Sequence, residues 1–227
     1  MSWDSEADFV DHFIASAHLI SCASKSRCVQ VWREVRTGYG RPDVVVIQYK
    51  RQALEKRPIS DAVGSPLSTG AAYAITYLTT RRWISREHLG TFLKCFGQRL
   101  DTVVQELISR RLIVTEGHLI KARPRDEILA VRNIWVFEAK LDHWKSAVQQ
   151  AERHLWFTND SYVLMPKKRD RLAYSISAEC NRRGIGLSLF SREAGLQTPL
   201  RPRQSGFINS PLLWTINEQL LEKSVES

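Results

Sequence analysis

The sequence predicts an α/β fold in which a mixed β-sheet is flanked by helices and interrupted by an inserted helical segment. Apolar runs of strand length recur toward both ends of the chain, at 43–49, 134–137, 161–165 and 185–190. Segments with apolar residues at helical spacing lie between or beside these runs. Between the first and second of these runs, residues 71–125 follow a different pattern of successive helical segments and one short hairpin. A discontinuous α/β domain with one insert accounts for all three observations.

The charge balance favours a polyanionic partner. The chain has 227 residues, and 33 Lys and Arg outnumber 24 Asp and Glu, giving a formal net charge of +9. An excess of this size indicates nucleic acid as the first candidate, with DNA preferred over an anionic membrane surface. No run approaches 18 apolar residues and the first ten residues carry early acids, so we expect a cytoplasmic protein that does not enter a membrane. The four cysteines are scattered and predict neither a zinc site nor disulfides.

The amino-terminal elements are expected to be one helix and two strands. Residues 4–21 repeat apolar side chains at the spacing of an amphipathic helix. Residues 28–36 and 43–49 read as strands joined by the turn sequence TGYGRP. Residues 51–70 contain two prolines and two glycines among serines and threonines, which indicates a linker.

The segment 71–125 has the order helix, turn, helix, turn, helix and hairpin. Ser85 can cap the second helix, and the turn at Glu116-Gly117 joins the two short strands. This order resembles a winged helix-turn-helix, in which the third helix enters a DNA groove. The segment holds ten basic and four acidic side chains, so it contributes +6 of the net +9.

The third helix of this segment carries side chains suited to DNA on the side away from its apolar positions. Arginine, glutamine and threonine can contact base edges and phosphates. The alternatives are that these side chains form a solvated helix face or a surface for another protein. The basic excess favours DNA over both. The residues expected to contact DNA are Gln98, Arg99, Thr102 and Arg110, with Glu106 on the same side.

The α/β pattern resumes after the insert. Strands are expected at 134–137, 161–165 and 185–190, and helices at about 142–157 and 167–183. The segment 196–211 is proline-rich and basic and predicts an extended loop, followed by a short helix from Pro211. Residues 1–50 and 126–227 would then form one domain around the linker 51–70 and the insert 71–125.

Two predicted strands carry charged side chains at their ends. Side chains alternate along a strand, so Glu138 and Lys140 share one face about 6.6 Å apart, while Ala139 faces the opposite layer. Asp43 stands at the start of another apolar strand, and its carboxylate can meet that of Glu138 if the strands are neighbours. Two carboxylates and the Ala139 carbonyl are the hard ligands that Mg²⁺ prefers, and Mn²⁺ can substitute for it. Beside them, Lys140 could hold a nucleophile and offset phosphoryl charge in metal-assisted phosphodiester hydrolysis.

The sequences GRPD and FEAK, on two apolar strands with a glutamine-bearing helix behind, resemble the PD-(D/E)xK nuclease superfamily. The resemblance covers residues 1–50 and about 130–190, and it implies a restriction-endonuclease-like fold with the elements in α-β-β-β-α-β order. Its motif residues map onto Asp43, Glu138 and Lys140, with Gln150 as the supporting helix glutamine. A further acid would be Glu34, or Glu6 where that acid lies on the first helix.

One departure from this family is the 95 positions between Asp43 and Glu138, where a short hairpin is usual. A folded insert with nearby ends costs little closure entropy, so the winged-helix segment accounts for the spacing. The resemblance implies a Mg²⁺-dependent DNA endonuclease, with a homodimer where both strands are cut.

Other interpretations of the same residues, without a catalytic role, stay open. Glu138, Lys140 and Asp43 could be ordinary polar residues at strand ends and in a turn, and Glu34 could simply pair with a basic neighbour. At the level of the whole protein, the alternatives are a DNA-binding regulator or structural protein that keeps the nuclease fold without turnover, and a protein-interaction module in a larger complex.

Overall fold

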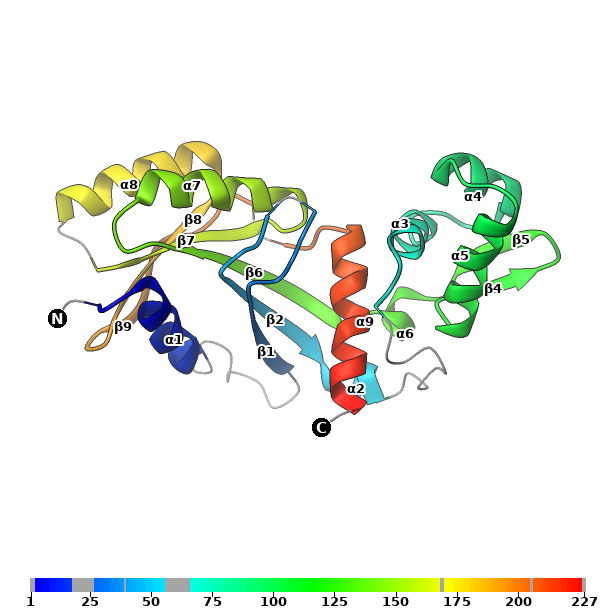
Figure 1. Ribbon diagram of the computed structural model, residues 1–227, viewed down its shortest axis with the longest axis horizontal. Helices are drawn as coiled ribbons and strands as arrows, with labels where there is room; N and C mark the ends of the chain where they lie inside the picture. Colours follow the sequence, from blue (N-terminus) through cyan, green and yellow to red (C-terminus); the bar gives the residue numbers. More distant parts are fainter. Residues whose placement is uncertain are drawn as a thin grey trace. The chain divides into compact units, whose positions relative to one another are not determined.

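The computed structural model describes residues 3–17, 27–38, 40–55, 66–167, 170–204 and 206–225 (Figure 1). The chain divides into two compact units, each made of two separate stretches of sequence. The first unit contains Met1–Tyr49 and Arg132–Ile208, and the second contains Lys50–Val131 and Asn209–Ser227. In the described ranges, no helix has both the length and the apolar character needed to cross a membrane.

The first unit is built on a six-stranded mixed sheet with the strand order β1-β2-β6-β7-β8-β9. β6, β7 and β8 are parallel, and β9 pairs antiparallel with β8 at the edge. β1 and β2 meet across a turn in which the Glu34 N–H donates to the Asp43 carbonyl at 3.2 Å. The strands are β1 (Arg27–Arg33), β2 (Val44–Lys50), β6 (Val131–Ala139), β7 (Asp160–Pro166), β8 (Gly186–Ser191) and β9 (Gly195–Leu200).

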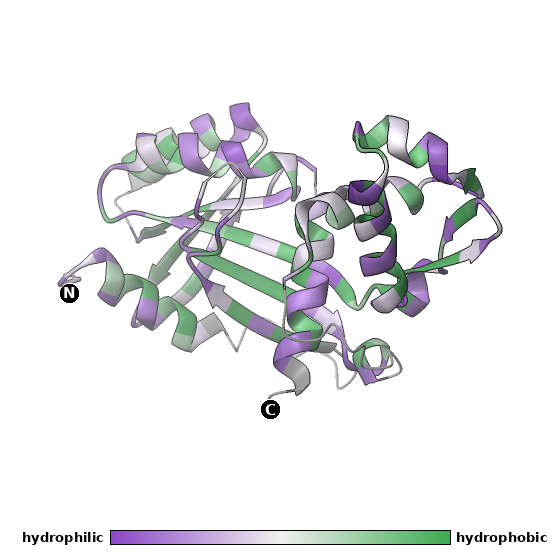
Figure 2. Cartoon of the chain, turned by 45° about the vertical axis from the view of Figure 1, so that its right-hand side comes forward, coloured by the Kyte–Doolittle hydropathy of each residue, from purple (hydrophilic) through white to green (hydrophobic). Residues whose placement is uncertain are grey.

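Helices cover both faces of this sheet, which makes it an α/β layer structure. α1 (Glu6–Ala17) lies on one face. α7 (Trp144–Arg153), a 3₁₀ turn (His154–Trp156) and α8 (Asp170–Arg183) lie on the other. The strands between them are predominantly hydrophobic (Figure 2). β2 illustrates the reason, because all four residues from Val44 to Ile47 are at most 1% exposed, as the unbroken apolar run predicts.

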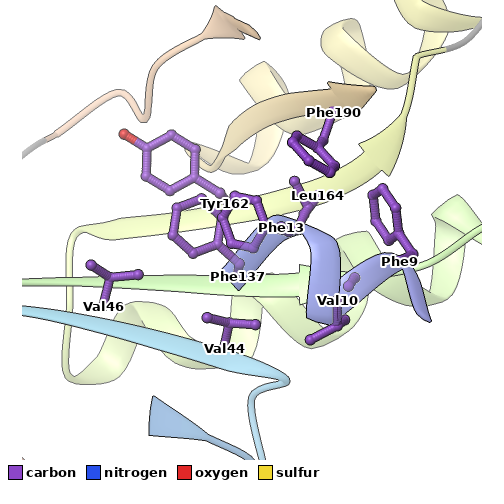
Figure 3. Close-up of a cluster of buried hydrophobic side chains, with 10 residues drawn as sticks. Phe9, Val10, Phe13, Val44, Val46, Phe137, Tyr162, Leu164 and Phe190 are labelled. Carbon is purple, nitrogen blue, oxygen red and sulfur yellow. The ribbon is translucent and has the colours of Figure 1, made fainter. Parts of the chain in front are cut away.

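The core beneath α1 is rich in aromatic side chains (Figure 3). Phe13 meets Phe137 edge to face with ring centroids 5.0 Å apart, and Phe137 stacks on Tyr162 at 5.2 Å. Phe13 also contacts Phe190 on β8, so one helix side chain bridges two strands that are not neighbours. Phe137 and Ala139 face this core, which places the intervening Glu138 on the opposite face of the sheet.

The second unit combines helices with a small antiparallel sheet of strand order β3-β5-β4. The Ser85 hydroxyl caps α4 by accepting from the His88 N–H at 3.1 Å, as the sequence predicts. Gly117 has a φ of +57° in the turn between β4 and β5, a conformation that glycine adopts without strain. The elements are α2 (Arg51–Glu55), α3 (Thr69–Leu78), β3 (Ile84–Ser85), α4 (Arg86–Leu93), α5 (Gln98–Ser109), β4 (Ile113–Glu116), β5 (Leu119–Ala122), α6 (Arg125–Ile128) and α9 (Pro211–Val225).

The carboxyl-terminal helix α9 belongs to this second unit, although the sequence analysis placed residues 209–227 with the α/β domain. The Asn217 side chain accepts from the Ala130 N–H at 2.8 Å and donates to the Ile128 carbonyl at 3.0 Å. Trp214 is fully buried and donates its indole N–H to Asn209 at 3.0 Å. Buried hydrogen bonds of this kind fix α9 against the second unit.

Two further expectations need correction. Residues 51–55, expected to begin a linker, form the short helix α2. Residues 195–200, expected within an extended loop, form the edge strand β9. The last four residues of the expected first helix and residues 56–65 of the expected linker lie outside the described ranges.

Candidate functional site

Two of the three residues of the proposed motif, Asp43 and Lys140, come together at the end of two neighbouring strands. The Asp43 carboxylate, just before β2, accepts from the Ala139 N–H of β6 at 2.8 Å. Lys140 follows the last residue of β6, and its Nζ lies 4.0 Å from Asp43 Oδ2. Lys50 also hydrogen-bonds to Ala130, so β2 and β6 run antiparallel and Asp43 faces the carboxyl end of β6. The long sequence separation therefore does not keep Asp43 away from the end of β6.

Glu6, the first residue of α1, completes this cluster. Its Oε2 lies 2.8 Å from Lys140 Nζ, a charge-assisted hydrogen bond with the ammonium 18% exposed. Burial alone would lower the pKa of Lys140, but the hydrogen bond that its ammonium donates to Glu6 and the charge of Asp43 outweigh burial and raise this pKa above its ordinary value. Lys140 is therefore a cation at neutral pH and does not serve as a general base.

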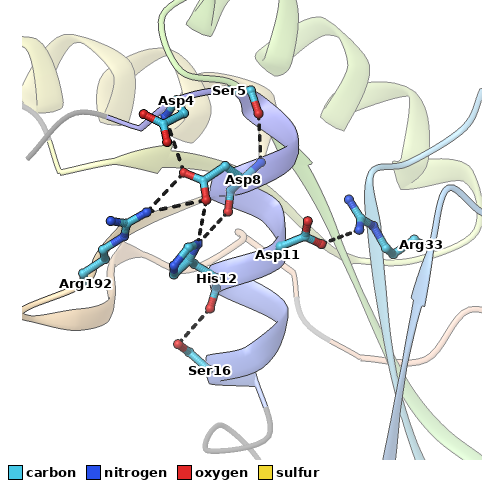
Figure 4. Close-up of polar contacts among 8 residues, drawn as sticks. All are labelled: Asp4, Ser5, Asp8, Asp11, His12, Ser16, Arg33 and Arg192. Carbon is cyan, nitrogen blue, oxygen red and sulfur yellow. Dashed lines mark hydrogen bonds and ion pairs between the residues drawn. The ribbon is translucent and has the colours of Figure 1, made fainter.

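The α1 helix that carries Glu6 is fixed by polar contacts along its length (Figure 4). Asp8 pairs with Arg192, beyond β8, at 3.2 Å, and with the His12 ring at 3.1 Å on the helix itself. Asp11 forms an ion pair with Arg33 at the end of β1. These contacts join α1 to β1 and to the segment after β8, and they hold its first turn beside Lys140.

Glu138 lies on the other face of the sheet, where it is 2% exposed. Its Oε1 lies 2.5 Å from Nε2 of His154, which is also buried. Burial raises the pKa of Glu138, and the charge of Asp43 adds to this effect, while the hydrogen bond from His154 and the charge of Lys140 oppose it. The sequence analysis missed His154 because it has no second histidine at metal-ligand spacing. His154 follows the last residue of α7, and a lone histidine at a helix end gives no local sign of its partner.

Gln150 and Glu34, both expected at the site, have different surroundings in the structure. Gln150 lies one helical turn before His154, and its buried Oε1 has no hydrogen-bond partner within the described part of the chain. Glu34 has a φ of 50° and an exposed side chain that pairs with Arg41 at 2.5 Å. Glu6, rather than Glu34, is therefore the further acid beside Lys140.

The oxygen atoms at this strand end do not form a closed metal centre, and a Mg²⁺ ion held here would take only some of its ligands from the protein. Among the residues that the structure describes, no three His, Cys, Asp or Glu side chains form a metal-binding group. Mg²⁺ commonly takes only one or two protein carboxylates and keeps water and phosphate as its other ligands. Asp43 and Glu138 offer two carboxylates, and the Ala139 carbonyl points to the same strand edge as the N–H that contacts Asp43.

The outer face of α5 presents three of the four residues expected to contact DNA. Gln98, Arg99 and Thr102 are exposed, although the Thr102 hydroxyl donates back to the Gln98 carbonyl at 2.9 Å. The β4–β5 hairpin lies close to the start of α4, because the His118 carbonyl accepts from the Arg86 N–H at 2.9 Å. The Arg86 side chain in turn pairs with Asp101 in the first turn of α5.

Arg110 is not on this face, which corrects its assignment as a DNA contact. It is 4% exposed and lies within 3.5 to 3.7 Å of the carboxylates of Glu106, Glu218 and Glu222. Two of these acids belong to α9. The guanidinium therefore joins α5 to α9 inside the second unit.

Comparisons of the chain with protein-family models, with curated proteins and with solved structures gave no match.

Proposed function

We propose that this protein is a Mg²⁺-dependent DNA endonuclease of the PD-(D/E)xK type. The observation that carries the proposal is the convergence of Asp43 and Lys140 on the end of β6, with Asp43 Oδ2 2.8 Å from the Ala139 N–H and 4.0 Å from Lys140 Nζ. Strand pairing across a long insertion brings together the residue types that the chemistry needs.

Each residue has a distinct role in this proposal. Asp43, Glu138 and the Ala139 carbonyl would hold Mg²⁺ or Mn²⁺, which when bound acts as a Lewis acid and activates water. Lys140 keeps its positive charge, so it orients the attacking water and offsets the charge that grows on the phosphoryl oxygens. Glu6 holds the ammonium of Lys140 in place.

The architecture supports both parts of the proposal. A mixed sheet with α1 on one face and α7 and α8 on the other is consistent with a restriction-endonuclease-like fold. The order α3-β3-α4-α5-β4-β5 with an antiparallel β3-β5-β4 sheet is consistent with a winged helix, in which α5 is the helix that reads DNA. Gln98, Arg99 and Thr102 are then its contacts.

A nicking assay on supercoiled plasmid with Mg²⁺ tests the proposal. Lys140→Ala should reduce cleavage by about 100-fold or more, because one preorganised charge at a reacting group typically contributes that much. DNA affinity should change by no more than about twofold, since most phosphate contacts lie elsewhere. Lys223→Ala, an exposed lysine on α9, is the matched control and should cleave normally. Undiminished cleavage by Lys140→Ala would refute the assigned role.

The burial of Glu138 favours a second candidate function. A carboxylate that is 2% exposed and already hydrogen-bonded to His154 is difficult for a metal ion to reach. A DNA-binding regulator that keeps this fold without turnover would tolerate such burial. It would leave supercoiled plasmid unchanged at every Mg²⁺ and Mn²⁺ concentration, while still binding DNA with an affinity that falls as salt rises.

A further inference from the structure

We infer that His154 is a positioning residue of the candidate site: its Nε2–H holds Oε1 of Glu138 and leaves Oε2 as the oxygen offered to a divalent cation. This inference rests on the proposed function, because it assigns a purpose to Glu138 as a ligand. His154 would not itself touch the cation or the DNA.

The imidazole is enclosed so that it has little freedom to turn away from Glu138. Both side chains are at most 3% exposed, and Nε2 lies 2.5 Å from Oε1. The Phe157 ring packs edge to face with it at 5.7 Å, and a Cβ placed on Gly40, in the β1–β2 turn, would lie 3.6 Å from its Cε1. The rigidity of a positioning group comes from such packing.

The hydrogen bonds of the ring decide where its proton lies. His154 Nδ1 is buried and has no hydrogen-bond partner within the described ranges. A proton on Nδ1 would leave a buried donor unsatisfied, whereas a proton on Nε2 has the carboxylate as its acceptor. The hydrogen-bond pattern therefore favours a ring that donates from Nε2 to Glu138.

A neutral donor suits a metal ligand better than a cationic one. It fixes the orientation of the carboxylate without cancelling the negative charge that attracts a cation. The hydrogen bond to His154 uses Oε1 of Glu138, so Oε2 is the oxygen that the carboxylate would offer to a cation. Without the donor, the carboxylate would lose its fixed orientation, and second-layer changes of this kind typically cost about 10- to 100-fold in metal affinity.

The test measures Mn²⁺ binding to the full chain without DNA, by isothermal titration calorimetry. His154→Leu, which fills similar space and lacks a donor, should bind Mn²⁺ about 10- to 100-fold more weakly than the wild type. His154→Gln, whose amide N–H can occupy the place of Nε2–H, should recover binding to within about threefold. His118→Leu, an exposed histidine of the second unit, should bind as the wild type does.

The outcomes separate this inference from the proposed function. Equal Mn²⁺ binding by wild type, His154→Leu and His154→Gln, with loss of binding in Asp43→Ala, would overturn the inference and leave the proposed function intact. Absence of Mn²⁺ binding by the wild type would overturn both.

A second measurement does not depend on any variant folding. Nitrogen-15 NMR of the wild type should show a proton on Nε2 of His154 and none on Nδ1 at neutral pH, and the reverse pattern would overturn the inference.

Discussion

Replacing Arg110 with alanine should destabilise the second unit while leaving DNA affinity unchanged. The guanidinium is 4% exposed and lies 3.5 Å from Glu218, which is itself buried. Glu106 and Glu222 approach it at 3.6 and 3.7 Å, with side chains 18% and 20% exposed. Removing the arginine leaves three carboxylates close together without their common counter-charge.

The expected magnitude follows from these distances. Two unit charges about 3.5 Å apart attract by roughly 5 kcal/mol at an effective dielectric constant of about 20, before desolvation is subtracted. Glu218 remains buried after the substitution, whereas the two partly hydrated acids are screened and contribute less. Breaking a buried pair from one side typically costs about 3–5 kcal/mol, and we expect a loss in that range.

The assay compares Arg110→Ala with Arg99→Ala, a matched arginine on the exposed face of the same helix. Urea unfolding should show the loss for Arg110→Ala and a change within about 0.5 kcal/mol for Arg99→Ala. Hydrogen exchange in α5 and α9 should locate the loss in the second unit. Fluorescence anisotropy with a labelled duplex should give the opposite ranking for DNA affinity. An Arg110→Ala protein of wild-type stability that binds DNA more weakly would refute this reasoning.

Three further predictions concern the first unit. Phe13→Ala should lower the free energy of unfolding by about 3–5 kcal/mol in urea denaturation, because the ring is fully buried between aromatic neighbours. Burial raises the pKa of the Cys180 thiol to about 12, so mass spectrometry after iodoacetamide treatment at pH 8 should find Cys180 unmodified and Cys95 alkylated in the folded protein. Hydrogen bonds from neighbouring arginines lower the pKa of Glu179 to about 2, so its stabilisation is present above the ordinary value of 4.5 and is lost as the pH falls toward 2. Glu179→Gln should therefore lower the melting temperature at pH 7, and the difference should vanish near pH 2.

The parts of the fold that the sequence predicted are those with a strong local pattern. β2 and β6 are apolar runs buried by the layers around them. Glu138 and Lys140, expected on one face, have different surroundings: Glu138 bonds to His154, whereas Lys140, past the last residue of β6, bonds to Glu6 of α1. β9 was missed because residues 195–200 lack an apolar run, include Gly195 and Pro199, and are all partly or fully exposed. An edge strand tolerates these features, so its sequence resembles a loop.

The parts that the sequence did not predict depend on contacts between distant elements. Arg110 follows the last residue of α5, so extending the helical period placed it on the outer face, whereas α9, about 110 positions later, covers it. Glu34 looked equivalent to Glu6 as a further acid, but its positive φ turns its side chain toward Arg41. The spacing of apolar residues in the sequence predicts neither the burial of Arg110 nor the pairing of Glu34 with Arg41.

The charge of the candidate site joins the two halves of the proposed function. Counted as ionised, Asp43, Glu138 and Glu6 supply three negative charges against one positive charge on Lys140, which leaves −2 when the His154 ring is counted as neutral. A DNA phosphate is repelled by such a cluster. A divalent cation restores neutrality and gives the phosphate a ligand position. On the proposed function, the cation is therefore what allows an acidic site in a basic protein to accept a DNA phosphate. DNA would approach this site productively when the metal is bound, and the exposed face of α5 would supply the affinity that does not depend on it.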